Sequence, residues 1–177
     1  MRTLRLKLVW VLVLPFLWFA SPTPNWMLLG ASVGIAGLLL RAWAAGTIRK
    51  EQQLTTTGPY AFTRNPLYVG SFFLGVGLTV AGGGWIWLAL FLAFYFGVYG
   101  RTIAGEESLL LDLFGDRYRA YAANVPRICP RLSRWRESTT DPGSGFGWAQ
   151  YVRNREWEAA LGVLVGFGIL GLKIWLK

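Results

Sequence analysis

Histidine is absent from the sequence, cysteine occurs once, and charged residues are scarce. Charged side chains make up 15% of the 177 residues, whereas a soluble domain carries about 25%. The single cysteine, Cys129, excludes an internal disulfide framework, and its distance from the C-terminus excludes a prenylation motif. Because there is no histidine, any base that the chemistry needs has to be another side chain, such as a carboxylate or a tyrosine.

Hydrophobic residues are abundant instead, at 54% of the chain, together with 10 Trp and 22 Gly. High glycine content and interfacial tryptophan are typical of membrane helices. Five apolar stretches approach the ~20 residues that cross a bilayer, and they cover residues 6–20, 26–45, 67–81, 85–99 and 157–175. We therefore expect an all-α integral membrane protein with about five transmembrane helices, forming one membrane domain over residues 1–177.

Pairs of glycines spaced four residues apart occur in the second and fifth stretches, at Gly30 and Gly34 and at Gly162 and Gly166. Small residues at this spacing allow the backbones of two membrane helices to approach closely. We expect these pairs to pack helices within the protein rather than to form a dimer interface.

The distribution of basic residues predicts the orientation in the membrane. The turns at 21–25 and 82–84 hold no charge, and of the eighteen basic residues only Lys173 and Lys177 fall on their side. Basic residues collect in cytoplasmic loops, so we expect the N-terminus and the active site in the cytoplasm and the C-terminus outside. This topology explains the net charge of +9 better than nucleic-acid binding does, and no nucleic-acid partner is expected.

A first polar segment, GPYAFTRNPLYVG, covers residues 58–70. Within it, Asn65 and Pro66 suit the N-cap and first position of the third apolar helix. A helix N-terminus also presents free backbone N–H groups that can hold a carboxylate, and Tyr68 lies one turn further on the same face. Taken alone, this segment leaves both a helix cap and a binding site open.

A second polar segment covers residues 106–130 and begins with Glu106 and Glu107. Adjacent acids at a membrane exit are costly if they face lipid, so both are solvated or one turns inward to bind a cation or polar ligand. Gly115 should break the helix, and Asp116 should cap a short helix that ends before Pro126. The two polar segments end neighbouring helices joined by a tight hairpin, so we expect them to meet.

These segments resemble the isoprenylcysteine carboxyl methyltransferase family, within the wider group that includes phosphatidylethanolamine N-methyltransferases. The family pattern G-x-Y-x-x-x-R-H-P-x-Y-x-G is matched by Gly58, Tyr60, Arg64, Asn65, Pro66, Tyr68 and Gly70. The later pattern, E-E-x-x-L then F-G-x-x-Y-x-x-Y-x-x-x-V-P-x-x-x-P, is matched by Glu106, Glu107, Leu110, Phe114, Gly115, Tyr118, Tyr121, Val125, Pro126 and Pro130. The main departure is Asn65, where the carboxyl methyltransferases have His and the phosphatidylethanolamine enzymes have Asn.

The resemblance covers a methyltransferase core over residues 44–130, followed by an expected cytoplasmic linker at 131–156 and an extra C-terminal transmembrane helix at 157–176. It implies S-adenosylmethionine as methyl donor, in a cytoplasmic site built from loops and short helices. The implied donor-binding residues are Gln52, Gln53, Leu54, Thr55, Tyr60, Asn65, Pro66, Leu67, Tyr68 and Glu106. The resemblance also implies a catalytic role for Arg101, close to the position of an arginine that holds the substrate carboxylate. Glu107 is the second catalytic candidate, as a base.

The acceptor is expected to be lipophilic, such as a lipid or a prenylated molecule in contact with membrane lipids. A carboxylate is ionised at neutral pH and needs only a cationic clamp such as Arg101, whereas an ammonium needs a base such as Glu107 or Tyr68. This favours a carboxylate like that of isoprenylcysteine, while Asn65 favours a phospholipid N-methyltransferase. A non-catalytic membrane scaffold or lipid-binding protein is the alternative of another class. No metal site is expected, and the oligomeric state is left open.

Overall fold

The computed structural model describes residues 2–49, 53–136 and 145–176, with side chains from residue 11 onward. All regular secondary structure in these ranges is helical, as expected. The helices are α1 (Arg2–Phe19), α2 (Pro24–Thr47), the 3-10 turn η1 (Gly58–Ala61), α3 (Pro66–Ala81), α4 (Trp85–Asn124), α5 (Trp148–Arg153) and α6 (Trp157–Trp175).

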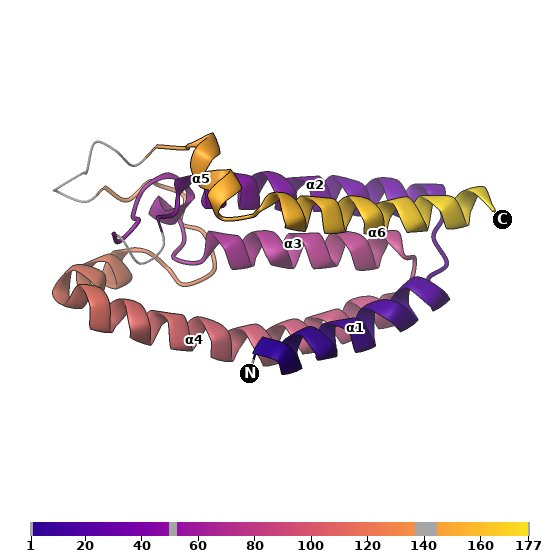
Figure 1. Ribbon diagram of the computed structural model, residues 1–177, viewed down its shortest axis with the longest axis horizontal. Helices are drawn as coiled ribbons and strands as arrows, with labels where there is room; N and C mark the ends of the chain where they lie inside the picture. The colour runs from indigo at the N-terminus through magenta and orange to yellow at the C-terminus, as the bar shows by residue number, and fades with distance from the viewer. Residues whose placement is uncertain (1, 50–52, 137–144, 177) are drawn as a thin grey trace.

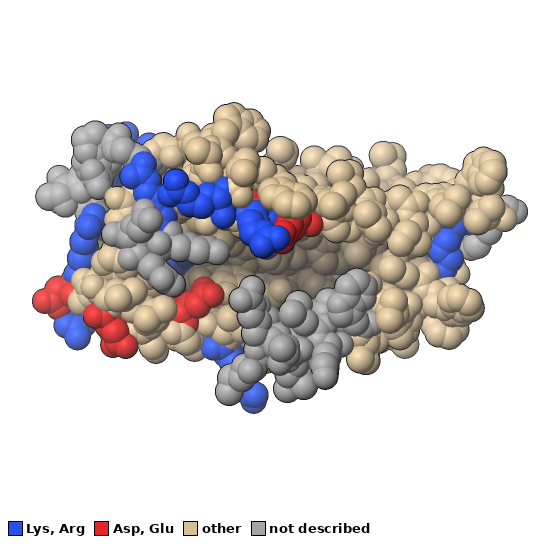
Figure 2. Space-filling view, viewed as in Figure 1, with Lys and Arg blue, Asp and Glu red and all other residues tan. Residues whose placement is uncertain are grey.

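The long helices run nearly parallel to one another, with η1 and the polar loops gathered at one end of the molecule (Figure 1). At the other end lie the α1–α2 turn, the α3–α4 turn and the C-terminus. The two uncharged turns touch, since the amide of Ser21 donates to the carbonyl of Gly82 at 3.0 Å. Figure 2 shows basic side chains gathered around the loop end, on the face in view.

Among the described residues, three helices are long and apolar enough to cross a membrane: α2, α4 and α6. Helix α3 is apolar but has only 16 residues, fewer than the ~20 that span a bilayer. Helix α1 has 18 residues, and Arg2, Arg5 and Lys7 shorten its apolar part. The prediction of about five spans is therefore confirmed for three helices.

Helices α2 and α3 pack at backbone distance through glycines. A Cβ atom added at Gly30 would lie 2.3 Å from the carbonyl oxygen of Gly77, and one added at Gly37 would lie 2.8 Å from that of Gly70. Such close approach is the effect expected of small residues between membrane helices. The prediction for the first glycine pair is confirmed. The second pair is confirmed only in part, because Gly162 has no neighbour within 4 Å.

Charged side chains fix α6 at both of its ends. At its start, the carboxylate of Glu156 pairs with the guanidinium of Arg41, which lies inside α2. At its end, the ammonium of Lys173 donates to three carbonyls in the last residues of α1 and just after it, those of Leu17, Trp18 and Ala20, at 2.9, 2.7 and 2.7 Å. A cation at a helix C-terminus also interacts favourably with the helix dipole. Both contacts draw α6 onto the rest of the bundle.

Helix α4 continues well past its apolar part and bends at Gly115, whose φ of 50° and ψ of −124° are not helical. This is the break that the sequence predicted, and a glycine tolerates such a φ without a Cβ clash. Beyond it, Tyr118 and Tyr121 are buried, and the helix ends at Asn124, before Pro126, as expected. Helix α4 thereby brings the second polar segment back against the first.

Candidate functional site

The two polar segments lie against each other at the loop end of the bundle, as the sequence predicted. The amide of Arg64 donates to the carbonyl of Pro126, and the amide of Arg131 donates to the carbonyl of Phe62, both at 2.9 Å. The hydroxyl of Thr63 adds bonds to the same loop. These bonds fix the loop before α3 onto the chain that follows α4.

A cavity, called here the polar cavity, opens where these segments meet the end of α2. Nine of the ten residues that the family resemblance implied for donor binding line it, namely Gln53, Leu54, Thr55, Tyr60, Asn65, Pro66, Leu67, Tyr68 and Glu106. The tenth, Gln52, lies outside the described residues. The structure thus brings the predicted set together, and the role of this set in binding stays a prediction.

Five further residues line the polar cavity that the sequence reasoning did not assign to it: Ile48, Arg49, Arg64, Leu110 and Tyr121. Arg64, Leu110 and Tyr121 were visible as members of the two family motifs. Ile48 and Arg49 follow the end of α2 and carry no local signal. Arg49 and Arg64 matter most, because they place cationic side chains at the cavity.

Glu106 turns toward the polar cavity and is held by a tyrosine. Its Oε1 atom accepts a hydrogen bond of 2.7 Å from the hydroxyl of Tyr68. The backbone carbonyl of Tyr68 in turn accepts a bond of 2.7 Å from the hydroxyl of Tyr95. The ring of Tyr68 also packs edge-on against Tyr99, with centroids 5.3 Å apart. A carboxylate is therefore oriented at the cavity by residues of α3 and α4.

Glu107, which was predicted as a catalytic residue, does not line the polar cavity. Its Oε2 atom lies 2.6 Å from Nη2 of Arg127. Its Oε1 atom lies 3.3 Å from Nη2 of Arg64, within ion-pair distance but without hydrogen-bond geometry. Two guanidinium groups therefore engage this one carboxylate. The contacts of Glu107 instead join α4 to both polar segments.

Arg101 is exposed and lines neither this cavity nor the apolar groove described below. It precedes Glu106 by five residues, which places it about 140° around α4 from that carboxylate. The predicted clamp is therefore on another face of the helix. The cations at the polar cavity are Arg49 and Arg64 instead.

Asn65 stands at the N-cap of α3, but its side chain does not cap the helix. Its amide nitrogen donates to the carbonyl of Arg127 at 3.0 Å. The expected side-chain cap is therefore wrong, because the adjacent loop offers this amide a carbonyl across the interface. Pro66 does occupy the start of the helix, as predicted.

Tyr60 is buried in the wall of the polar cavity, and its hydroxyl has no hydrogen-bond partner among the described residues. Burial is the main cause that raises the pKa of Tyr60 well above its ordinary value, and nearby Tyr121 and Glu106 raise it further. The phenol is therefore protonated and has a proton to donate. Buried polar groups without a partner are rare and call for an explanation, and a bound ligand would supply one.

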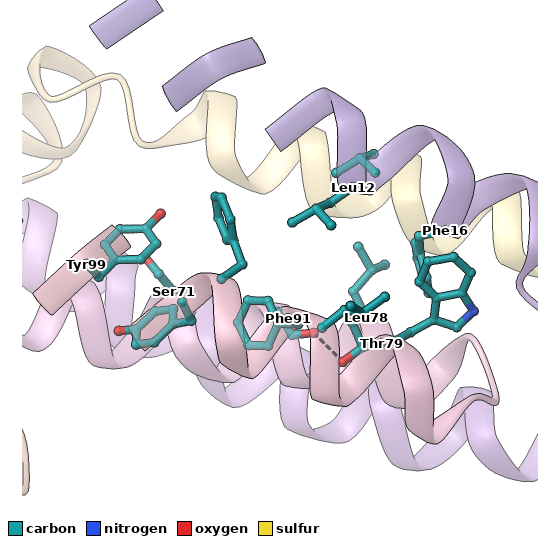
Figure 3. Close-up of a pocket in the computed structure, with 13 residues that line it drawn as sticks. Leu12, Phe16, Ser71, Leu78, Thr79, Phe91 and Tyr99 are labelled. Atoms are coloured by element: carbon teal, nitrogen blue, oxygen red, sulfur yellow. Dashed lines mark hydrogen bonds between the residues drawn. The ribbon is translucent and has the colours of Figure 1, made fainter. Parts of the chain in front are cut away.

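An apolar cavity of about 220 Å³, called here the apolar groove, lies between α1, α3 and α4 (Figure 3). Residues from these three helices face one another across it, including Leu12, Phe16, Ser71, Leu78, Thr79, Phe91 and Tyr99. The hydroxyls of Ser71 and Thr79 donate to backbone carbonyls of α3, so the lining is effectively apolar. Tyr99 contacts Tyr68, which places one end of the groove beside the polar cavity.

No group of metal-ligating side chains is found in the part of the chain that the structure describes. The sequence has no His and one Cys. Soft divalent metals are bound mostly by these two residue types.

Comparison with known proteins gives matches of three kinds. The chain is 36% identical over 126 residues to the nickel-cobalt-cadmium resistance protein NccN of Alcaligenes xylosoxydans xylosoxydans, which covers 70% of this chain and 57% of that protein. It is 35% identical over 83 residues to the protein-S-isoprenylcysteine O-methyltransferase of Schizosaccharomyces pombe. This match covers 47% of this chain and 35% of that protein. It is 37% identical over 79 residues to methanethiol S-methyltransferase 1 of Bradyrhizobium diazoefficiens. This match covers 45% of this chain and 25% of that protein.

The chain thus spans less than two thirds of the length of each of these relatives. No solved structure matches it. The model of the phospholipid methyltransferase family matches residues 27–117, which include most of α2, all of α3, the first polar segment, Glu106, Glu107 and the kink of α4 at Gly115. Together with its apolar helices and its methyltransferase relatives, this match shows that the chain is a membrane protein of the phospholipid methyltransferase family, within the group that also contains the isoprenylcysteine methyltransferases.

Proposed function

We propose that the protein transfers a methyl group from S-adenosylmethionine to a lipophilic acceptor, with a carboxylate as the favoured acceptor group. The observation that carries this proposal is the polar cavity, which gathers nine of the ten expected donor-binding residues around an unpartnered tyrosine hydroxyl. The adjoining apolar groove supports the lipophilic nature of the acceptor.

The residues of the polar cavity fit the charges of this donor. Bound S-adenosylmethionine supplies an electrophilic methyl group, and its other end carries an ammonium and a carboxylate. Glu106 is the acid that would pair with the ammonium, while Arg49 and Arg64 are the cations that would pair with the carboxylate. The Tyr60 hydroxyl would donate to a polar atom of the donor, and the ring of Tyr68 offers a face that attracts a cation.

The apolar groove supports an acceptor that approaches from within the membrane. The groove runs along α3 from Thr79 to Ser71. Tyr99, which lines the groove, contacts Tyr68, which lines the polar cavity. A hydrocarbon chain in the groove would therefore bring its polar end beside the donor. Holding the two reactants in this relation is itself a large part of catalysis in a direct displacement.

The titratable groups at the site favour an acceptor that is already an anion. Glu106 accepts a hydrogen bond from Tyr68, and Glu107 lies between two arginines outside the cavity. Tyr60 has a raised pKa, so it does not act as a base near neutral pH. An ionised carboxylate needs no base, whereas an ammonium does. The relative from Schizosaccharomyces pombe is named for an isoprenylcysteine acceptor, which agrees with this choice.

Phospholipid N-methylation is the second candidate, because the family model that matches is named for phospholipids. Asn65, which suggested this reading in the sequence, gives it no structural support. The side-chain amide of Asn65 donates to the carbonyl of Arg127, in the loop after α4.

The test is a transfer assay with radiolabelled donor and the full-length protein in lipid nanodiscs. A prenylated cysteine with a free carboxylate is the first acceptor, and the same compound with its carboxylate already esterified is the matched control. We expect label in a base-labile ester for the first compound and none for the second. Base-stable label in phosphatidylethanolamine would favour N-methylation, and no transfer to either acceptor class would contradict the proposal.

A further inference from the structure

Residues 147–156 follow the part of the chain that the family model matches, which ends at residue 117. They form α5, the residue before it and the three residues that join it to α6. Sequence reasoning treated them as part of a linker. In the structure they contact the end of α2 directly, and they reach the start of α3 through Arg41 of α2.

The first contact is made to the C-terminal end of α2. The side chain of Gln150 donates to the carbonyl of Ile48 at 2.7 Å, and that of Asn154 donates to the carbonyl of Ala45 at 2.8 Å. The amide of Gly147 donates to the carbonyl of Gly46 at 2.8 Å. The last carbonyls of a helix have no partner within the helix, so α5 supplies the partners that α2 lacks. Ile48 then leads directly into the wall of the polar cavity.

The second contact runs through the buried carboxylate of Glu156. This residue is 8% exposed, and it pairs with the guanidinium of Arg41 through Nε and through Nη2, the latter at 3.0 Å. The third nitrogen of the same guanidinium, Nη1, donates to the hydroxyl of Ser71 and to the carbonyl of Leu67, the latter at 3.3 Å. Leu67 lies between Pro66 and Tyr68, and all three line the polar cavity.

One guanidinium therefore ties the start of α6 to the first turn of α3. Its two anchor points on α3 also belong to different cavities, since Leu67 lines the polar cavity and Ser71 lines the apolar groove. The charges of Arg41 and Glu156 also act on Tyr60, which lines the polar cavity. The charge of Glu156 raises the pKa of Tyr60 and that of Arg41 lowers it, both by less than burial does.

We propose that residues 147–156 form a clamp that sets the spacing of the two walls of the polar cavity, with Gln150, Asn154 and Glu156 as positioning residues for donor binding. The inference rests on the proposed function, because it assigns the donor to this cavity. The clamp holds one wall through the end of α2 and the other through Arg41. Loss of a clamp contact lets the walls separate, and a preorganised site binds more weakly once it has to be ordered by its ligand.

Two matched pairs of substitutions test the clamp. Glu156→Gln removes the buried charge, and Glu158→Gln makes the same change two residues away, where the exposed acid pairs with exposed Arg155. Asn154→Ala removes the bond to α2, and Arg153→Ala alters an exposed neighbour on the same short helix. Each variant of the full chain is titrated with S-adenosylmethionine in nanodiscs, and its thermal midpoint is measured without ligand.

We expect Glu156→Gln and Asn154→Ala to raise the donor Kd by about tenfold, with no change for the two controls. The KM of the acceptor should stay constant, because only the donor walls move. A purely structural role would lower the thermal midpoint and leave the donor Kd of the folded fraction unchanged, which would overturn the clamp. If Glu156→Gln does not fold, Asn154→Ala decides the question by the same titration. Failure of the wild type to bind donor would instead contradict the proposed function.

Discussion

Replacing Tyr60 with phenylalanine is predicted to shift stability and affinity in opposite directions. The substitution removes one hydroxyl that is buried in the polar cavity and has no hydrogen-bond partner among the described residues. In the free protein this hydroxyl is a cost, because a buried polar group without a partner loses its hydration. In the proposed donor complex it would donate a hydrogen bond.

The magnitudes follow from these two states. An unsatisfied buried hydroxyl costs about 1–3 kcal/mol, and a made hydrogen bond contributes about 0.5–1.5 kcal/mol. Tyr60→Phe should therefore stabilise the free protein by about 1–3 kcal/mol, or roughly 2–4 °C of thermal midpoint per kcal/mol for a chain of this size. Binding moves the hydroxyl from an unpaired to a paired state, so its loss should weaken donor binding by the sum of the two effects, about 1.5–4.5 kcal/mol, which raises the donor Kd by about 10- to 2000-fold.

The assay is a thermal melt of wild type and Tyr60→Phe, each with and without saturating donor, combined with titration calorimetry. Tyr121→Phe is the matched control, because the buried hydroxyl of Tyr121 donates to the carbonyl of Tyr60 at 2.7 Å. That variant should be less stable than wild type by about 1–3 kcal/mol, since a buried carbonyl loses its partner. A lower midpoint for Tyr60→Phe without ligand, or an unchanged Kd, would refute the reasoning.

Three further predictions concern the bundle, and each is measured by the thermal midpoint in nanodiscs. Lys173→Met should destabilise the protein by about 1–3 kcal/mol, because three carbonyls at the end of α1 lose their shared donor; an unchanged midpoint would show that α1 is held by other contacts. Gly77→Ala should cost about 1–3 kcal/mol through overpacking, since its Cβ would lie 2.6 Å from the carbonyl oxygen of Gly30, whereas Gly97→Ala, with no neighbour within 4 Å, should be neutral or stabilising. Gly115→Ala should cost about 1–2 kcal/mol because its φ is 50°, and equal stability would show that the kink can be removed.

Much of the polar cavity was predictable because its signals are local. The first polar segment supplies Tyr60 and Asn65 to Tyr68 within a short loop and one helical turn, and Glu106 follows one hairpin later. A glycine between two helical patterns was enough to predict the kink at Gly115. The family motifs therefore predicted the composition of the cavity, although they did not predict side-chain direction.

Side-chain direction and distant pairing were the parts that sequence reasoning missed. Glu106 and Glu107 are adjacent in sequence, but they face a cavity and a pair of arginines respectively. Arg41 pairs with a residue 115 positions away, a distance over which no periodicity acts. One signal was available, because a charge inside an apolar span is costly and calls for a partner.

The predicted span count is confirmed only in part, for a related reason. An apolar run predicts burial, either in lipid or in protein, and does not separate the two. Helix α3 is apolar along its length, yet its 16 residues are packed on α2 through glycines. Its hydrophobicity is explained at least as well by contact with other helices as by contact with lipid.

The most direct test of the central claim is calorimetric titration of S-adenosylmethionine into the purified full-length protein, its Glu106→Gln variant and its Asp112→Asn variant. Glu106 lines the polar cavity, whereas Asp112 is exposed on the same helix and lines neither cavity. We expect a 1:1 signal for the wild type and for Asp112→Asn, and no measurable binding for Glu106→Gln, because the donor's ammonium loses its counter-charge. No heat with the wild type at millimolar donor, or equal affinity in all three proteins, would contradict donor binding in this cavity.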